Sequence, residues 1–400
     1  MAPLASLYIH SPFCERKCLY CDFYSVAGIE SVEDFLAALV REIALRGERH
    51  STAAYETVFF GGGTPSLLTP QQLGSILARL HRAFRIPSDA EITLEANPGT
   101  VTRATLTAFR ALGVNRLSVG VQSFHDHELA FLGRTHDSAE ARQCVSDARD
   151  AGFENIAMDL IYSIPGQTLP DWDASLRMGI GLHPQHIAAY SLAVEADTPL
   201  AWSVRAGTVR PNPTEIEAAM YERAMDTLAA HGYDHYEVSN YARPGFRCRH
   251  NCTYWAHGDY LGLGPSAHSF WKSADGRSGT RCWNTSDLST YLERLQRGLV
   301  PIAGEERVGV RDLLHERILL GLRSDGLDLA HLRADFGDGL DVAQGTLMRW
   351  MIEQQLAVHE AGFLRLTPRG FVVCDEICAR LARDVHGAPA SASSLALPTD

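Results

Sequence analysis

The first half of the chain alternates short apolar runs with longer stretches in which apolar residues recur every three or four positions. The short runs predict strands, and the longer stretches predict amphipathic helices between them. The predicted strands are Leu7–Ile9, Thr57–Phe60, Ile92–Leu94, Arg116–Val121, Ile156–Ile161 and Ile187–Leu192. The predicted helices are Val32–Arg46, Pro70–Phe84, Arg103–Leu112, Ser138–Ala151, Leu169–Ile180 and Pro213–His231.

Repeated strand–helix units are typical of a parallel sheet with right-handed crossovers. Polar residues and glycines gather after successive strands, where the active sites of βα barrels lie, so a partial (βα)6 barrel is favoured over a doubly wound sheet. We therefore predict an α/β core domain over residues 1–235.

The pattern changes after about His235, where a stretch rich in glycine, histidine and aromatic residues shows no sustained period. We expect loops and short strands over residues 236–304 that cover a site. Helical patterns then return at Leu313–Leu322, Leu327–Phe336 and Thr346–Glu353, before an alternating segment at Leu364–Thr367 and a last helix at Phe371–Asp384. Helices followed by a small hairpin predict a winged-helix-like helical domain over residues 305–385. The tail, 386–400, is rich in Ala, Ser and Pro and is expected to be disordered.

Composition narrows the class of protein. A 400-residue chain with 46% hydrophobic residues and no apolar run of membrane-spanning length has material for a large core and one appended domain. The net charge of −12 argues against general nucleic-acid binding, which depends on cationic side chains. The start of the chain lacks the features of a signal peptide, and nine cysteines are modest usage, so we expect a reduced, cytoplasmic protein.

Three cysteines stand close together near the start of the chain. Cys14, Cys18 and Cys21 form a C-x3-C-x2-C pattern. Three such thiolates can hold three irons of a [4Fe–4S] cluster and leave the fourth iron open for chemistry. A zinc site usually pairs C-x2-C with a second ligand pair, and a disulfide framework needs a short, cysteine-dense chain in an oxidising compartment. Neither condition is met, so the pattern favours the cluster.

Further candidates follow the predicted strands. The run Gly61–Pro65 permits close backbone approach to a ligand, and it is not a P-loop because no Gly-Lys-Ser/Thr follows. Glu95 ends one strand, and Asp159 lies inside an apolar run, where a carboxylate is costly without partners. Taken singly, either acid fits a structural hydrogen-bonding role equally well. Together with Gln122 and Arg134 they converge on one barrel mouth.

Five segments carry a resemblance to a known family. They are Tyr8–Cys14, the three-cysteine loop, Gly61–Pro65, Glu95–Pro98 and Asp159–Thr168. Over most of residues 7–300 the chain resembles radical S-adenosylmethionine enzymes of the oxygen-independent coproporphyrinogen oxidase group. Within that group it is most similar to the heme chaperone branch.

The resemblance implies roles for individual residues. Cys14, Cys18 and Cys21 would ligate the cluster, and S-adenosylmethionine would bind its open iron. The residues implied around that molecule are Tyr8, Gly62 and Glu95. The residues implied for a second S-adenosylmethionine are Tyr20, Gly63, Thr64, Gln122, Arg134, Asp159 and Ala193. An electron from the cluster would cleave a C–S bond and give a 5′-deoxyadenosyl radical.

Two departures from the oxidases favour the chaperone branch. The oxidases continue the loop with a fourth cysteine and have an N-terminal extension, whereas here Asp22 and Phe23 follow Cys21 and six residues precede Leu7. The chain would then bind heme and pass it to acceptor hemoproteins, expected to be respiratory. The alternative is an oxygen-independent coproporphyrinogen III oxidase, a radical oxidative decarboxylase. The resemblance leaves open the electron donor, radical turnover and whether the chain forms a dimer.

The motif H-N-x-x-Y-W resembles one associated with heme handling in that branch. Its residues are His250, Asn251, Tyr254 and Trp255. The resemblance implies His250 as an axial ligand, with the two aromatic rings offering flat surface to a porphyrin. Two alternatives stay open: a loop histidine satisfied by a backbone carbonyl, and a zinc site. The candidate zinc ligands are Cys248, Cys252, His250 and His257.

Overall fold

A computed structural model of the chain describes residues 4–337 and 345–386. Its centre is a curved, open sheet with the strand order β14-β13-β12-β11-β1-β4-β5-β6-β7-β8-β10-β9. All six predicted strands are confirmed. They are β1 (Leu4–Ser11), β4 (Ala54–Gly62), β5 (Glu91–Ala96), β6 (Arg116–Gln122), β7 (Asn155–Tyr162) and β8 (His186–Ser191), and each pairs in parallel with the next. The predicted partial barrel is therefore confirmed.

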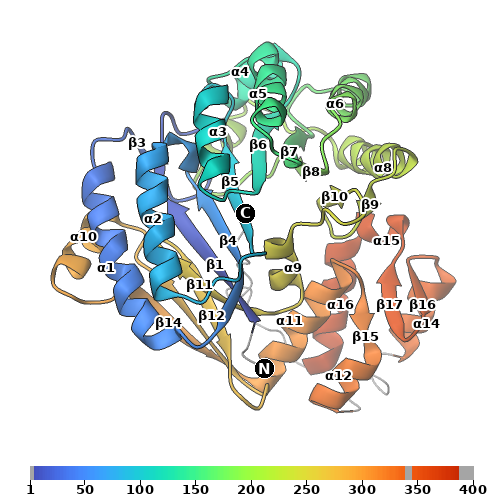
Figure 1. Cartoon of the computed structure of the whole chain (residues 1–400). Coiled ribbons are helices and arrows are strands. Elements are labelled where there is room, and N and C mark those ends of the chain that lie inside the picture. Colours follow the sequence, from blue (N-terminus) through green and yellow to red (C-terminus); the bar gives the residue numbers. More distant parts are fainter. Residues whose placement is uncertain (1–3, 338–344, 387–400) are drawn as a thin grey trace.

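The predicted helices of the core domain are confirmed and lie along the outer face of the curved sheet (Figure 1). They are α1 (Val32–His50), α2 (Pro70–Ala83), α3 (Arg103–Ala111), α5 (Ser138–Asp150), α6 (Leu169–Gly181) and α8 (Thr214–Ala230). Two short helices, α4 (Asp126–Leu132) and α7 (Pro199–Arg205), were not predicted. Seven residues make barely two turns, too few to establish a helical period.

Local sequence starts several of these helices. Thr69 and Thr168 precede α2 and α6, and each side chain accepts a hydrogen bond from the backbone N–H three residues on, Gln72 and Asp171. The side chains of Gln72 and Asp171 accept from the capping threonine N–H in return, so donors that the helix leaves unpaired are satisfied. Residues next to each helix start therefore fix where α2 and α6 begin.

The segment 236–304 differs from its prediction. Its strands are real, but they continue the sheet at both edges instead of only covering a site. The strand β10 (Asn240–Ala242), with β9 (Asp234–His235) just before this segment, extends one edge. The strands β11 (Asp259–Leu263), β12 (His268–Lys272), β13 (Gly279–Asn284) and β14 (Ile302–Val308) extend the other. β11 pairs in parallel with β1. The expectation of loops was wrong for α9 (Arg249–Trp255) and α10 (Leu288–Gln296).

The C-terminal helices and hairpin form a small domain, as predicted. Its elements are α11 (Val310–Leu322), β15 (Leu327–Asp328), α12 (Leu329–Phe336), α14 (Gly345–Glu353), β16 (Ala357–Glu360), β17 (Phe363–Leu366), α15 (Pro368–Val372) and α16 (Cys374–His386). The strands form a sheet of order β15-β17-β16. Two boundaries were wrong: Leu327 and Asp328 pair as a strand, and the last helix is divided at Val373. Most of the predicted disordered tail, 387–400, lies outside the described residues.

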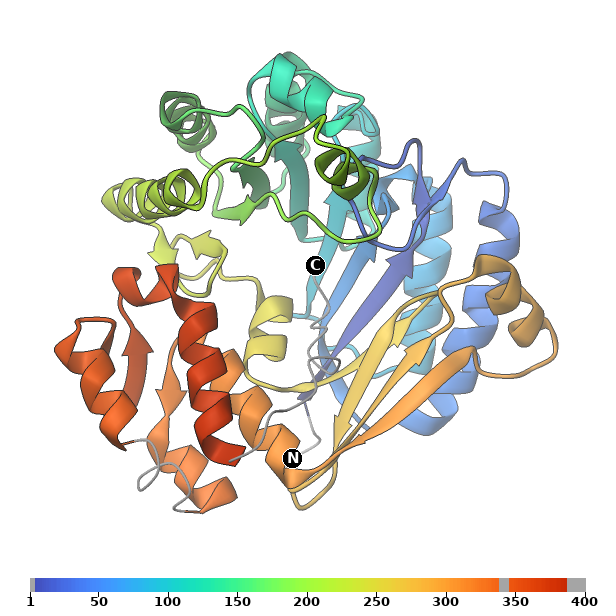
Figure 2. The ribbon, with the colours of Figure 1, turned by 180° about the vertical axis from the view of Figure 1, so that it is seen from behind.

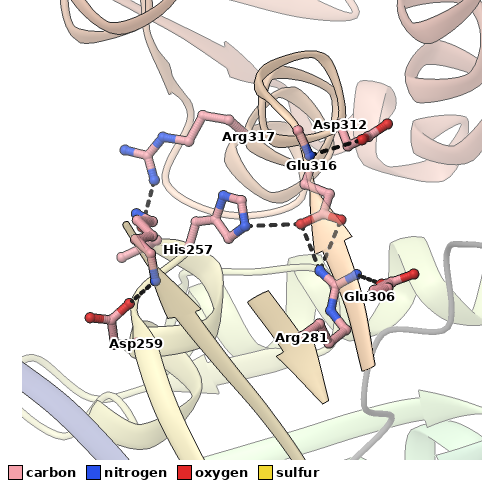
Figure 3. A network of polar contacts seen from close by, with 10 residues as sticks. His257, Asp259, Arg281, Glu306, Asp312, Glu316 and Arg317 are labelled. Carbon is pink, nitrogen blue, oxygen red and sulfur yellow. Dashed lines mark hydrogen bonds and ion pairs between the residues drawn. The ribbon is translucent and has the colours of Figure 1, made fainter. Parts of the chain in front are cut away.

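A polar network joins the small domain to the edge of the large sheet (Figure 3). Arg281 on β13 contacts Glu306 on β14 at 2.5 Å and Glu316 on α11 at 2.8 Å. His257 contacts the same Glu316 carboxylate at 2.9 Å. Burial raises the pKa of Glu316, but the hydrogen bonds from His257 and Arg281 outweigh it and lower that pKa. The charged form of Glu316 is therefore stabilised where the two domains meet.

A second buried carboxylate, Glu42, joins helix α1 to the strands β11 and β13 and to helix α10. Glu42 on α1 is 0% exposed. Its oxygens accept hydrogen bonds from the Gly264 N–H at 2.8 Å, the Tyr291 hydroxyl at 2.7 Å and the Asn284 amide at 2.7 Å. These donors come from the end of β11, from α10 and from β13. One side chain thus joins α1 to three later elements.

Among the described residues, no helix is long and apolar enough to cross a membrane.

We predict that Glu42→Ala lowers the free energy of unfolding by about 3 kcal/mol, because it leaves three buried donors without an acceptor. Urea denaturation followed by circular dichroism measures this. Glu48→Ala, at an exposed position of the same helix, is the matched control and should change stability by less than about 0.5 kcal/mol. Equal effects of the two substitutions would contradict the role given to Glu42.

Candidate functional site

A cavity of about 290 Å³ lies inside the curve of the sheet and reaches from the carboxyl ends of the parallel strands to their amino ends. It brings together most of the residues predicted from the sequence. Those that line it are Cys14, Cys18, Cys21, Tyr20, Gly62, Gly63, Thr64, Glu95, Gln122, Arg134, Asp159, Ala193 and Asn251. Tyr8, His250, Tyr254 and Trp255 are not among its lining residues.

The cysteine loop is fixed by its own backbone. Cys14 ends the short strand β2 (Phe13–Cys14), which pairs in parallel with β3 (Val26–Ala27). The Gly28 N–H donates to the Cys14 carbonyl at 2.9 Å, and the Cys21 N–H donates to the Cys18 carbonyl at 3.3 Å. All three cysteine side chains are partly exposed. The thiols are therefore presented to the cavity by a loop of defined shape.

The glycine loop after β4 packs directly against this cysteine loop. The Gly63 N–H donates to the Ser11 carbonyl at 2.7 Å, and the Thr64 N–H donates to the Phe13 carbonyl at 2.7 Å. A Cβ atom on Gly63 would lie 2.6 Å from the Phe13 carbonyl oxygen, too close for any other residue. Close approach of backbone to backbone thus explains Gly63, and its N–H already has an acceptor.

A chain of hydrogen bonds joins two of the cysteines. The Thr64 hydroxyl donates to the Cys14 sulfur at 3.6 Å, and the Asn97 amide donates to the Thr64 hydroxyl at 3.0 Å. Arg134 donates to the Asn97 oxygen at 2.5 Å and to the Cys18 sulfur at 3.7 Å. The sequence had not singled out Asn97, although it stands in the segment Glu95–Pro98. Arg134, implied for a second S-adenosylmethionine, lies against a cysteine here.

Burial favours the uncharged form of two of the three thiols. Burial raises the pKa of Cys14 and raises that of Cys21 to about 11. Metal binding therefore has to release protons from these cysteines. No three histidine, cysteine, aspartate or glutamate side chains of the described residues converge on one ion position. Zinc needs such convergence, whereas each cysteine of a [4Fe–4S] cluster binds a different iron, so this donor set fits a cluster better than zinc.

Asp159 stands on the inner face of β7, halfway along the cavity. Its carboxylate accepts a hydrogen bond from the Ser118 hydroxyl at 3.3 Å. Burial raises its pKa to about 6, and nearby Arg116 offsets part of that rise. Tyr8, implied beside S-adenosylmethionine, contacts His10 through its hydroxyl at 3.2 Å. The two acids Glu95 and Asp159 line the same cavity as the three cysteines and offer it hydrogen-bond acceptors.

The histidine of the H-N-x-x-Y-W motif is enclosed. His250 is 0% exposed, and its Nδ1 and Nε2 atoms contact the hydroxyls of Thr57 at 2.7 Å and Tyr254 at 2.9 Å. The Thr57 hydroxyl donates its own hydrogen to Ser6, so it accepts from Nδ1–H, and Nε2 accepts from Tyr254. Burial lowers the pKa of His250 to about 3. The partners are two hydroxyls, so the backbone-carbonyl alternative was wrong.

The remaining motif residues face other environments. Asn251 lines the cavity, and its side-chain oxygen accepts from the Cys248 thiol at 3.3 Å. Trp255 lines a separate groove of about 260 Å³ together with Cys252 and Arg317 of the small domain. Figure 2 shows α9, in yellow, between the sheet and the small domain. The four motif residues therefore do not form one flat surface in this structure, and His250 has no free nitrogen for an iron.

Comparison with known proteins agrees with this architecture. Residues 8–179 match the model of the radical SAM superfamily, and residues 310–373 match the model of the HemN C-terminal domain. The whole chain also resembles the solved structure of the coproporphyrinogen III oxidase HemN from Escherichia coli, with a TM-score of 0.80, 22% identity, and coverage of 95% of this chain and 90% of that one. At that identity the likeness shows the fold alone.

Curated relatives are closer in sequence. The heme chaperone HemW of Bacillus subtilis is 33% identical over 94% of this chain and 98% of its own length. HemW of a Synechocystis species is 40% identical over 79% of this chain and 77% of its own. A mitochondrial radical S-adenosyl methionine domain-containing protein 1 from Bos taurus is 36% identical over 80% and 73%. The chain belongs to the HemW family within the radical SAM superfamily.

Proposed function

We propose that the protein is a cytoplasmic heme chaperone that binds heme and transfers it to acceptor hemoproteins, and that it holds a [4Fe–4S] cluster and S-adenosylmethionine. The observation that carries this proposal is the similarity to proteins named heme chaperone HemW along almost the whole chain. The three-cysteine loop without a fourth cysteine supports it. We also propose that the acceptor proteins include respiratory hemoproteins.

In this proposal the cysteine loop and its neighbours hold the cofactors. Cys14, Cys18 and Cys21 would ligate three irons, and the cluster with S-adenosylmethionine would supply one-electron chemistry. Thr64 and Arg134 would donate hydrogen bonds to the ligating sulfurs, which stabilises negative charge on them. Glu95 and Asp159 would accept hydrogen bonds from S-adenosylmethionine. The sheet and its outer helices would keep water from the site.

Heme binding through His250 requires a local opening. A neutral imidazole binds iron through a lone pair, and in this structure the Nε2 lone pair accepts the Tyr254 hydroxyl. Tyr254 lies on the same short helix, one turn away. Rotation of the tyrosine and displacement of α9 would free the Nε2 atom for an iron. The proposed heme site is therefore formed by movement of α9.

The main rival is an oxygen-independent coproporphyrinogen III oxidase. We expect anaerobically reconstituted protein to form a distinct heme complex and to give no porphyrin product from coproporphyrinogen III with S-adenosylmethionine and a reductant. Absorption spectroscopy measures both in parallel on one sample. If the protein converted coproporphyrinogen III and bound no heme, the proposed function would be that of the oxidase and not of a chaperone.

We predict that Tyr254→Phe strengthens heme binding about five- to tenfold, because it frees the Nε2 lone pair, breaks one hydrogen bond worth about 1 kcal/mol and keeps the ring. His250→Ala should abolish the spectral signature of histidine-ligated heme. Heme titration measures both effects. Tyr260→Phe, on the neighbouring strand, is the matched control. Unchanged spectra in His250→Ala would remove His250 as the ligand.

We predict that Thr64→Val lowers the reduction potential of the cluster by on the order of 60 mV, because about 1.4 kcal/mol of sulfur hydrogen bonding is lost. A spectroscopic redox titration of the reconstituted protein measures this. Thr107→Val, at an exposed position of α3, is the control and should leave the potential unchanged. A potential that stays the same in Thr64→Val would show that this hydroxyl does not act on the cluster.

A further inference from the structure

Asn97 stands between the two side chains that donate hydrogen bonds to cysteine sulfurs. Its amide nitrogen donates to the Thr64 hydroxyl at 3.0 Å, and its side-chain oxygen accepts from Arg134 at 2.5 Å. The Thr64 hydroxyl donates in turn to the Cys14 sulfur at 3.6 Å. Arg134 donates to the Cys18 sulfur at 3.7 Å. One amide therefore links the donors of two of the three cysteines.

The hydrogen bonds of this chain all run in one direction. A guanidinium only donates, so the atom of Asn97 that faces Arg134 has to be the carbonyl oxygen. The amide nitrogen then faces Thr64 and donates to its hydroxyl oxygen. The hydrogen of that hydroxyl is left to point at the Cys14 sulfur. Asn97 thus makes the Thr64 hydroxyl a donor toward the cysteine.

A tight turn fixes the backbone of Asn97. The sequence Asn97-Pro98-Gly99-Thr100 follows β5, and the Thr100 N–H and hydroxyl donate to the Asn97 carbonyl at 3.1 Å and 2.7 Å. Proline at the second position and a positive φ at the third, here +88° at Gly99, are the pattern of a type II turn. The local sequence therefore places the Asn97 side chain at the end of its strand.

Gly120 on the neighbouring strand β6 leaves room for the side chains of Asn97 and Arg134. A Cβ atom on Gly120 would lie 2.8 Å from the Asn97 side-chain oxygen and 3.0 Å from an Arg134 nitrogen. The Gly120 carbonyl also accepts a hydrogen bond from that nitrogen at 2.8 Å. Close packing at Gly120 therefore holds the guanidinium and the amide in contact.

We propose that Asn97 is a positioning residue for the iron–sulfur cluster, and that it raises the reduction potential of the cluster by directing the Thr64 hydroxyl to the Cys14 sulfur. This inference rests on the proposed [4Fe–4S] cluster and does not depend on heme binding. Donors to a ligating sulfur stabilise the reduced cluster, which carries one more negative charge. The guanidinium polarises the amide and, through it, the hydroxyl, which strengthens that donor. The potential in turn sets how readily the cluster accepts an electron.

Two substitutions of Asn97 remove or reverse its hydrogen bond to Thr64. Asn97→Ala leaves the hydroxyl free to rotate, so the ratio of reduced to oxidised cluster at a fixed applied potential should fall about threefold. Asn97→Asp keeps the shape of the side chain but accepts the hydroxyl hydrogen, so the ratio should fall at least tenfold, or about 59 mV for one electron. Redox titration of the reconstituted full-length protein without S-adenosylmethionine, followed by EPR spectroscopy, measures both. Gln143→Glu, exposed on the outer helix α5, adds the same charge and should leave the ratio unchanged.

A double-mutant cycle tests whether Asn97 acts through Thr64. In the Thr64→Val background there is no hydroxyl to direct, so the shifts caused by Asn97→Ala and Asn97→Asp should be at least halved. Equal shifts in both backgrounds, or a potential in Asn97→Asp at or above that of the parent, would overturn the inference. Loss of the cluster from both variants in protein that circular dichroism shows to be folded would also overturn it, because the three cysteines alone should hold the cluster.

The parent protein separates this inference from the proposed function. A parent that forms no [4Fe–4S] cluster would remove the cluster from the proposed function and this inference with it. A parent with an intact cluster whose potential does not respond to Asn97 would remove the inference alone.

Discussion

Two backbone hydrogen bonds between the loop after β4 and the cysteine loop hold the site together. They run from Gly63 and Thr64 to the carbonyls of Ser11 and Phe13, at 2.7 Å each. Because β1 and β4 are neighbouring parallel strands, the register of the sheet decides where the thiols stand. The same contact brings the Thr64 hydroxyl to Cys14 and, through Asn97, links it to Arg134 and Cys18. The contacts that hold β4 against the cysteine loop therefore also position the side chains of the site.

The two ends of the barrel are built differently. At the carboxyl ends of the strands, loops present sulfur and carboxylate groups to a cavity. At the amino ends, α9 is held against the sheet by buried polar contacts, including those of His250 with Thr57 and with Glu91. These contacts satisfy both ring nitrogens of His250, so α9 has a structural role in this arrangement.

Much of this could be predicted from the sequence. Parallel strands are buried on both faces and therefore read as continuous apolar runs, and capped helices between them show a clear period. Cysteine spacing and a lone acid inside an apolar run, Asp159, marked the cavity. The helix α9 was missed because it is seven residues long and depends on contacts with β4 and β5, which are distant in the chain. Arg116 and His186, which also line the cavity, were missed because a polar residue at the start of a strand usually reaches solvent, and only the structure shows that these do not.

The attachment of the small domain gives α9 a mechanical connection to the protein surface. Arg317 on α11 donates to the carbonyl of Ala256, which ends α9, and the next residue, His257, contacts Glu316 on the same helix (Figure 3). A tilt of α11 would therefore pull on the last turn of α9. Such a pull would reach Tyr254, two residues before Ala256, and through it the histidine ring. A tilt of α11 and the release of His250 Nε2 from Tyr254 would then be coupled through α9.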